Sequence, residues 1–186
     1  MRLFILVLTL IFSFNFAVLN KGLFAKKDEF PKKGEKLNNI EILDVNDKKC
    51  FLPSWGQKVL TIMYTDPDEK DINDDLSNAI KSKNYSTNKY LGIGVANCKD
   101  TWIPNGLIRR AAEQKQKDFP KSKILLDKGH LLSSAWHLGE CNDAGVVIVL
   151  GKDAKVKFIK KITKKEQSKK IISEVIAIID KEINKK

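Results

Sequence analysis

The pattern of apolar positions centres on residues 58–64, a compact apolar run rich in β-branched and aromatic residues. Such a run predicts a buried strand in the middle of a sheet. The residues that follow predict a helix start, because Asp66 can cap a helix and Pro67 suits its first turn. Glu69 stands at the capping-box spacing from Asp66. We expect the rest of the chain to be organised around this strand-to-helix junction.

The same patterns predict strands and helices along the rest of the chain. The predicted strands are an N-terminal hairpin at 40–43 and 49–52, then 58–64, 90–96, 124–127, 145–150 and 156–159. The predicted helices cover 67–82, 104–118, 131–138 and a final stretch that opens with a capping box at Thr163 and Glu166. Strand–helix alternation requires parallel strands, whereas the last two strands, joined by a short turn, must be antiparallel. The sequence therefore predicts an α/β fold with a mixed central sheet, helices on both faces and an N-terminal β-hairpin.

The N-terminus has the pattern of a secretory signal peptide. Arg2 precedes an apolar run from Leu3 to Leu19, and Ala25 is a candidate cleavage point. An uncleaved N-terminal anchor is the alternative reading, although the run is short beside the ~20 residues of a usual membrane span. We therefore expect residues 1–25 to direct the protein to the periplasm or otherwise out of the cell. An uncleaved segment would be its only contact with the membrane.

The remaining chain predicts one domain. Residues 26–38 are polar and predict a flexible lead-in, and 39–186 predict a single folded domain, since no internal repeat or second hydrophobic unit is visible. Hydrophobic residues make up 42% and charged residues 31% of the 186 residues, which is typical of a globular protein.

Charge and ligand-type residues narrow the function classes. The net charge is +11, but only Arg2, Arg109 and Arg110 among the 34 basic residues are arginines, and no basic motif is interleaved with aromatic residues. This pattern favours a lysine-rich solvated surface over nucleic-acid binding. With two histidines and no clustered metal-ligand spacing, the sequence predicts no metal site and no cofactor.

The order of elements resembles the thioredoxin fold in its extended, peroxiredoxin-like form. The segment 124–129 followed by a short helix ending at Trp136 resembles the inserted strand and helix of that group, and 149–156 resembles the late hairpin of the superfamily. The chain is most similar to the YtfJ-like family of predicted periplasmic proteins, from about Gly34 to Ile179. The segments that carry this similarity are 97–104, 135–138 and 146–153. The resemblance implies a three-layer thioredoxin-like fold and a compartment, but no agreed activity.

The departures from that superfamily bear on activity. Thioredoxin-like oxidoreductases would place Cys-x-x-Cys at 65–68, and peroxiredoxin-like enzymes a cysteine within 66–72, but neither stretch holds one. The usual cis-proline position falls on Gly145. A thiolate is needed to attack a disulfide and to reduce a peroxide. We therefore expect a non-catalytic binding or accessory module, with an unknown protein or small-molecule partner in the cell envelope.

Three cysteines keep a redox alternative open. On the thioredoxin-like fold, Cys98 and Cys141 fall in loops at the same sheet edge as the junction at Asp66. They are a candidate disulfide, which would stabilise the fold by roughly 3–4 kcal/mol in the chain-entropy model. Two unpaired thiols are one alternative, and the other is a redox-active pair in a thiol–disulfide oxidoreductase or peroxidase. Cys50 is predicted to be an ordinary small apolar residue.

A candidate binding groove follows from the same fold. Its residues would be Thr65, Asp66, Trp102, Trp136 and Gly145, brought together at one edge of the sheet. Core packing is the alternative for Trp136, while Trp102 stands in a polar loop.

The remaining chemistry-bearing side chains have structural explanations. Helix capping accounts for Asp66, Asp68 and Glu69 without a cation site. His130 is predicted to be exposed in a turn, and His137 to be solvated or satisfied in the core.

Overall fold

The structure is a computed structural model, and it describes residues 30–185. The predicted leader, 1–25, and residues 26–29 lie outside the described residues. The strands are β1 (Glu41–Asp44), β2 (Lys49–Phe51), β3 (Val59–Thr65), β4 (Tyr90–Asn97), β5 (Ser122–Asp127), β6 (Gly145–Leu150) and β7 (Val156–Ile162). The helices are the 3-10 helix η1 (Pro67–Glu69), α1 (Asp74–Ser82), α2 (Asn105–Asp118), α3 (Leu131–Ala135), α4 (Lys165–Lys170) and α5 (Ile172–Ile183).

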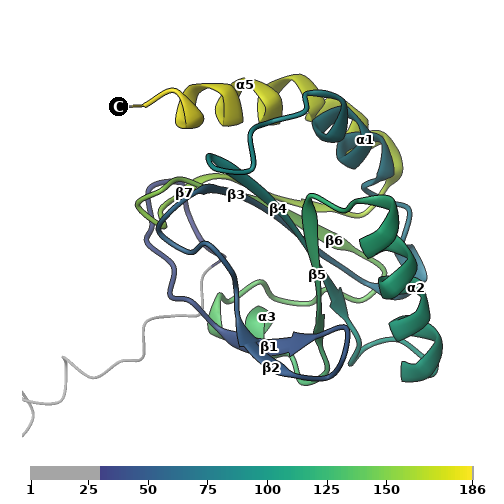
Figure 1. Cartoon of the computed structure of the whole chain (residues 1–186). Helices are drawn as coiled ribbons and strands as arrows, with labels where there is room; N and C mark the ends of the chain where they lie inside the picture. The colour runs from purple at the N-terminus through teal and green to yellow at the C-terminus, as the bar shows by residue number, and fades with distance from the viewer. Residues whose placement is uncertain (1–29, 186) are drawn as a thin grey trace, which may run out of the picture.

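The strands form one mixed seven-stranded sheet in the order β2-β1-β5-β4-β3-β6-β7 (Figure 1). β3, β4 and β5 are parallel neighbours, whereas β6 pairs antiparallel with β3 and with β7. The N-terminal hairpin extends the sheet because β1 pairs antiparallel with β5. The predicted mixed α/β sheet with its N-terminal hairpin is confirmed.

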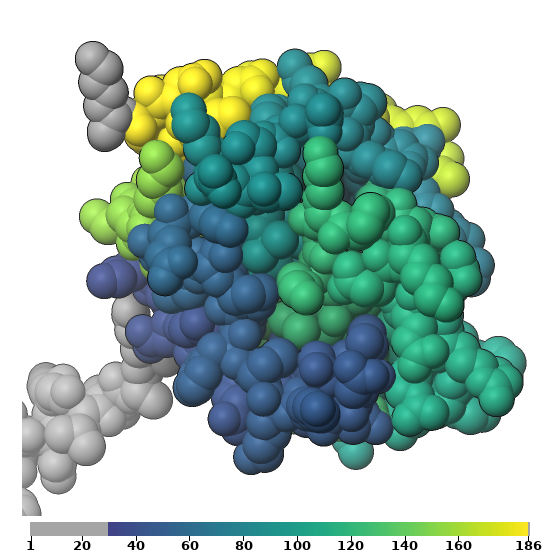
Figure 2. Space-filling view, viewed as in Figure 1, coloured from purple at the N-terminus to yellow at the C-terminus, as the bar shows by residue number. Residues whose placement is uncertain are grey.

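Alternate side chains of β3 divide the core into two layers. Leu60, Ile62 and Tyr64 face the side that carries α3 and the start of the described chain. Val59 and Met63 face the other side, where α1, α4 and α5 pack on the sheet. Helices therefore lie on both faces, as the three-layer prediction requires. The space-filling view shows the α5 end of the chain on one side of the molecule and the β1–β2 hairpin on the other (Figure 2).

The described part of the predicted flexible lead-in is attached to the domain. Gly34 N–H donates to the Val156 carbonyl at 2.7 Å, and Val156 N–H donates to the Glu35 carbonyl at 2.8 Å. Leu37 is buried in the core layer that carries α3. This segment therefore pairs with the start of β7 and buries an apolar side chain, while the flexibility predicted for residues 26–38 stays a prediction.

The helix predicted over 67–82 is interrupted. The 3-10 helix η1 ends at Glu69 and α1 begins only at Asp74. Between them Ile72 and Asn73 turn inward and are buried, 3% and 4% exposed. The sequence pattern detected the apolar face of α1 but not this inward turn, which depends on contact with a distant strand.

The end of the chain differs from its prediction in a similar way. The helical stretch is divided into α4 and α5 at Ile171. The predicted capping box of Thr163 and Glu166 does not form, because Lys164 is the N-cap. It is the side chain of Gln167, one residue further on, that accepts from Thr163 N–H at 2.8 Å. α3 is shorter than predicted, and β7 is longer.

Candidate functional site

Asp66 follows the end of β3, within the stretch 65–68 where the thioredoxin-like resemblance would place a redox centre. Its side chain is fully buried. One carboxylate oxygen accepts from Asp68 N–H at 2.9 Å, and the other accepts from Asp143 N–H at 2.8 Å. Burial raises the pKa of this carboxyl, and the two backbone hydrogen bonds oppose the shift. The predicted cap at η1 is present, and the same side chain also ties the loop before β6 to the end of β3.

Gly145 follows Asp143 by two residues and begins β6, next to the hydrogen bond between Asp143 and Asp66. A Cβ atom built there would lie 2.8 Å from Asn73 Nδ2 and 3.3 Å from Ile72 Cγ2. The residues between η1 and α1 thus pack against the backbone of β6 more closely than any side chain would permit. At Gly145, where the resemblance to the thioredoxin superfamily would place a cis-proline, Asn73 and Ile72 leave no room for a side chain.

Cys98 and Cys141 are free thiols that lie in different apolar clusters. Cys98 packs with Ile108 of α2 on one side of the sheet, and Cys141 packs with Trp136 on the other. Burial raises the pKa of each thiol to about 11. The candidate disulfide is therefore not formed, because the loops that follow β4 and precede β6 place the two thiols in different apolar clusters. Cys50, on β2, is free as well.

The five residues of the candidate groove do not share one open surface. Trp136 is 1% exposed, its Nε1 donates to the Asn38 carbonyl at 2.9 Å, and its ring centroid lies 5.7 Å from that of Trp55. Trp102 is 85% exposed. Core packing, the alternative for Trp136, is thus the arrangement in the structure, while Thr65 and Asp66 line a separate cavity described below.

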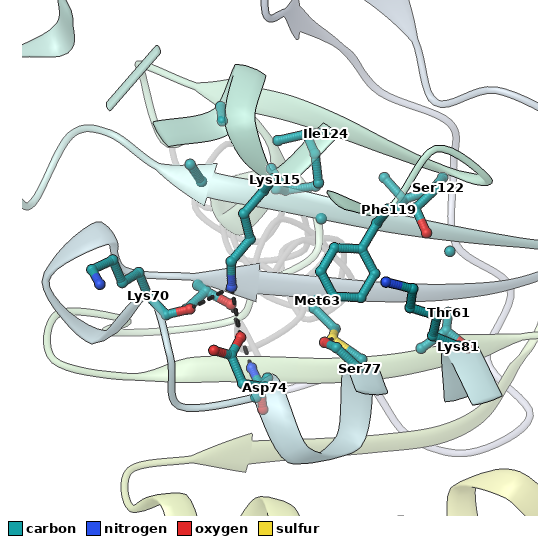
Figure 3. A pocket seen from close by; sticks show the side chains of 18 of the residues that line it. Thr61, Met63, Lys70, Asp74, Ser77, Lys81, Lys115, Phe119, Ser122 and Ile124 are labelled. Carbon is teal, nitrogen blue, oxygen red and sulfur yellow. Dashed lines mark hydrogen bonds and ion pairs between the residues drawn. The ribbon is translucent and has the colours of Figure 1, made fainter. Parts of the chain in front are cut away.

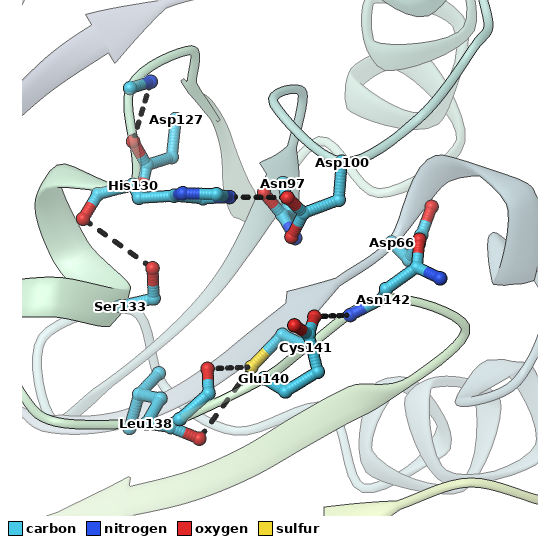
Figure 4. A network of polar contacts seen from close by, with 12 residues as sticks. Asp66, Asn97, Asp100, Asp127, His130, Ser133, Leu138, Glu140, Cys141 and Asn142 are labelled. Atoms are coloured by element: carbon cyan, nitrogen blue, oxygen red, sulfur yellow. Dashed lines mark hydrogen bonds and ion pairs between the residues drawn. The ribbon is translucent and has the colours of Figure 1, made fainter.

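A polar network runs along the carboxyl edge of β4 and β5 (Figure 4). Asp127, at the end of β5, is fully buried and accepts from Leu131 N–H at 2.8 Å and Leu132 N–H at 2.9 Å. The Tyr64 hydroxyl donates to the same carboxylate at 3.3 Å. Burial raises the pKa of Tyr64, so this hydroxyl keeps its proton as a donor. Asp127 therefore anchors α3 to the sheet.

The network also contains an aspartate–histidine pair. His130 Nε2 lies 2.7 Å from Asp100 Oδ1, and Asn97 Nδ2 donates to the other oxygen of Asp100 at 2.6 Å (Figure 4). Asp100 and His130 line a pocket of about 420 Å³ together with Ser133, Ser134, His137, Gly139 and Glu140. Its imidazole and carboxylate are suited to polar recognition and to proton transfer.

Sequence reasoning missed this pair, because it treated His130 as an exposed turn residue. The imidazole is 36% exposed and paired. The signal was present: Asp100 and His130 each follow the end of a predicted parallel strand, and such ends meet at one edge of the sheet. Within residues 30–185, no group of three His, Cys, Asp or Glu side chains is arranged to hold a metal ion.

A larger cavity, of about 600 Å³, lies between α1 and α2 over β3, β4 and β5 (Figure 3). Its floor on β4 is made of the small residues Gly92, Gly94 and Ala96. These residues alternate with the larger Ile93 and Val95, which point into the opposite core layer. In the sequence, the cavity is therefore indicated by β4, which has small residues on the face toward the helices α1 and α2 and larger residues on the other face.

Lysine side chains span the gap between the two helices. Lys115 of α2 donates to Asp74 Oδ1 at 2.6 Å and to the Lys70 carbonyl at 3.0 Å (Figure 3). Near the other end, Lys81 of α1 donates to the Asp118 carbonyl at 2.9 Å and lies 4.7 Å from the centroid of the Phe119 ring. Polar contacts therefore cross the gap at both ends of the cavity.

Comparison with known families gives one match over most of the chain. A family model described as "Bacterial protein of unknown function (YtfJ_HI0045)" matches residues 56–182. A curated uncharacterized protein of Haemophilus influenzae is 29% identical over 92 residues, which cover 49% of each chain. The uncharacterized protein YtfJ of Escherichia coli is 30% identical over 92 residues, again 49% of each. The alignments span about half the length of these curated relatives.

Solved structures establish the fold. A peroxiredoxin-like protein from Aquifex aeolicus superposes with a TM-score of 0.56 at 10% identity, covering 81% of this chain and 90% of that one. A thiol peroxidase from Chromobacterium violaceum gives 0.55 at 14% identity, covering 80% and 90%. At such identities the likeness shows a thioredoxin-like fold and nothing about activity. None of the helices in residues 30–185 combines the length and the apolar character that a membrane crossing needs.

Proposed function

The chain belongs to the YtfJ_HI0045 family of bacterial proteins of unknown function, and on that premise we propose that it is a thioredoxin-fold binding module without a redox centre. The observation that carries this proposal is Asp66. Both of its carboxylate oxygens accept hydrogen bonds from backbone N–H groups, and its side chain is buried within the stretch 65–68, where the resemblance to thioredoxin-like oxidoreductases would place the redox cysteines. A carboxylate held in this way fixes a loop and offers no thiolate for redox chemistry.

The thiols elsewhere in the domain support the same proposal. With a pKa of about 11, Cys98 and Cys141 are both protonated in neutral solution. At pH 7 only about one such thiol in ten thousand is a thiolate, so attack on a disulfide or peroxide is slow. Their placement in separate clusters gives neither thiol a resolving partner in the other.

The proposal includes export. The charged and apolar pattern of residues 1–25 would direct the protein to the periplasm, where its partner is a small molecule or a protein of the cell envelope. Intact mass of protein recovered from the envelope tests this part. Loss of about 25 residues is expected for a cleaved signal peptide, and retention of the whole chain would favour the anchored alternative.

The redox alternative is tested by turnover. We expect the wild-type protein to show no insulin reduction and no hydrogen peroxide consumption above a buffer control, with an active thioredoxin and an active peroxidase as positive controls. Turnover that is lost in Cys98→Ser or Cys141→Ser would overturn the binding-module proposal. A residual rate that both serine variants share would be independent of these thiols and would leave the proposal standing.

A further inference from the structure

The helices α1 and α2 lie on the same face of the sheet but belong to different apolar clusters. Leu76 and Ile80 of α1 pack with α5, whereas Ile108 and Ala112 of α2 pack with β5. Protein interiors normally leave few voids larger than a water molecule. The cavity of about 600 Å³ between these helices therefore has the size of a small-molecule site rather than of a packing defect.

The lining of the cavity is longer along β4 than across the sheet. Its lining extends along β4 from Tyr90 to Ala96, a path of about 20 Å at the usual rise of a strand. Across this direction the lining reaches from Met63 on β3 to Ile124 on β5, which is two strand spacings or about 10 Å. Such a shape suits one unbranched chain better than a compact, branched ligand.

The walls are mainly apolar along this length. Gly92 and Gly94 add no side chains to the floor, and a Cβ atom at Gly94 would lie 2.9 Å from Ile124 Cδ1. Met63 contributes from β3 and Ile108 from α2. An alkyl chain in this space would bury its surface against apolar groups, which is favourable by about 0.8 kcal/mol per methylene.

The two ends of the cavity differ in charge. At the end near η1, Lys115 is paired with the Asp74 carboxylate. At the other end, Lys81 donates to a backbone carbonyl and Lys121 to the side-chain amide oxygen of Asn84. The acceptors of these two hydrogen bonds are thus uncharged oxygens, and an anionic group can approach both ammonium groups without displacing a carboxylate.

We propose that this cavity binds a long-chain carboxylate, with the alkyl chain over Gly92 and Gly94 and the carboxylate near Lys81 and Lys121. The inference rests on the proposed binding function and names its ligand class. The lysines that bridge α1 and α2 cover the bound alkyl chain, and their hydrogen bonds between the two helices break when the ligand enters.

Fluorescence of 11-(dansylamino)undecanoate on the full-length protein tests the site, with palmitate as competitor. We expect saturable binding of one probe per chain. Ser77 lines the cavity from α1, so Ser77→Leu should fill it and weaken binding at least about tenfold. Ser82→Leu, the same substitution at an exposed position of the same helix, should change affinity less than about twofold. All variants keep the N-terminal apolar segment, so probe bound there contributes equally.

The headgroup position is tested separately. In the double variant Lys81→Gln, Lys121→Gln, the affinity for palmitate measured by competition should fall about fivefold. The affinity for hexadecanol should stay unchanged. Lys117→Gln, on the exposed part of α2, is the matched control. Equal losses for palmitate and hexadecanol would refute the headgroup assignment.

Two outcomes would overturn the cavity assignment. One is the absence of saturable probe binding to the wild type. The other is an affinity equal to that of the wild type in both Ser77→Leu and Ala112→Leu. These two substitutions fill the cavity from opposite walls, so the second still tests the site if the first variant misfolds. Either result would refute the ligand but would not support a redox role. The binding-module proposal itself would be refuted only by cysteine-dependent turnover, which is measured separately.

Discussion

At the scale of single residues, Asp66 determines how the carboxyl edge of the sheet is arranged. Its two oxygens join Asp68 at the start of η1 to Asp143 in the loop before β6. Asp66 N–H also donates to the Ala144 carbonyl at 3.0 Å. One residue therefore caps η1 and fixes the loop before β6.

Removing that side chain should destabilise the fold. Asp66→Ala leaves two backbone N–H groups without their acceptors, and we expect the free energy of unfolding to fall by about 2 kcal/mol. Asp66→Asn keeps one acceptor oxygen and should lose less. Chemical denaturation measures both, with Asp68→Asn, within ~0.5 kcal/mol of wild type, as control. Unchanged stability in Asp66→Ala would show that the tie contributes nothing.

The sequence predicted the local part of this site and missed its long-range part. A cap at Asp66 follows from Pro67 and the preceding strand, because helix starts are encoded by neighbouring residues. The bond to Asp143 and the pairing of Asp100 with His130 join segments far apart in the chain. No local pattern specifies such contacts; only the shared sheet edge indicated them.

At the scale of elements, the same distinction explains the helix errors. Strand positions were predicted to within a few residues, because buried apolar runs give a strong signal. The break before α1 was not predicted, since it arises where Ile72 and Asn73 meet the backbone at Gly145. The pairing of the thiols was missed for a related reason: Cys98 and Cys141 lie in loops whose packing into different clusters depends on the whole fold.

The contact at Gly145 gives a prediction for this junction. In Gly145→Ala the new Cβ would collide with Asn73 Nδ2, and we expect a loss of about 1–3 kcal/mol in unfolding free energy. Asn73→Ala should relieve part of that loss, giving a coupling of about 0.5–1 kcal/mol in a double-mutant cycle. Gly106→Ala, whose Cβ would meet nothing within 4 Å, is the control. Strict additivity would contradict the contact.

At the scale of the whole molecule, the described part of the chain, residues 30–185, forms three apolar clusters of unequal extent on the sheet. The largest joins α3 and the segment before β1 to the sheet, and a second joins α1, α4 and α5. The smallest holds α2 through four buried residues, Cys98, Ile108, Ala112 and Leu126. α2 is therefore held to the sheet by fewer buried apolar residues than the other helices, although the fold as a whole has the expected three-layer form.

On the side of the cavity, α2 is joined to α1 by lysine hydrogen bonds and ion pairs, so we expect α2 to move more easily than the other long helices. Solvated ion pairs and hydrogen bonds contribute only about 0–1 kcal/mol each, so α2 can move away from α1 without exposing the α1–α5 core. Amide hydrogen exchange should therefore show lower opening free energies along α2 than along α5. Equal protection of the two helices would contradict this. On this prediction, ligand entry would require movement of one helix only, and the rest of the fold would stay closed.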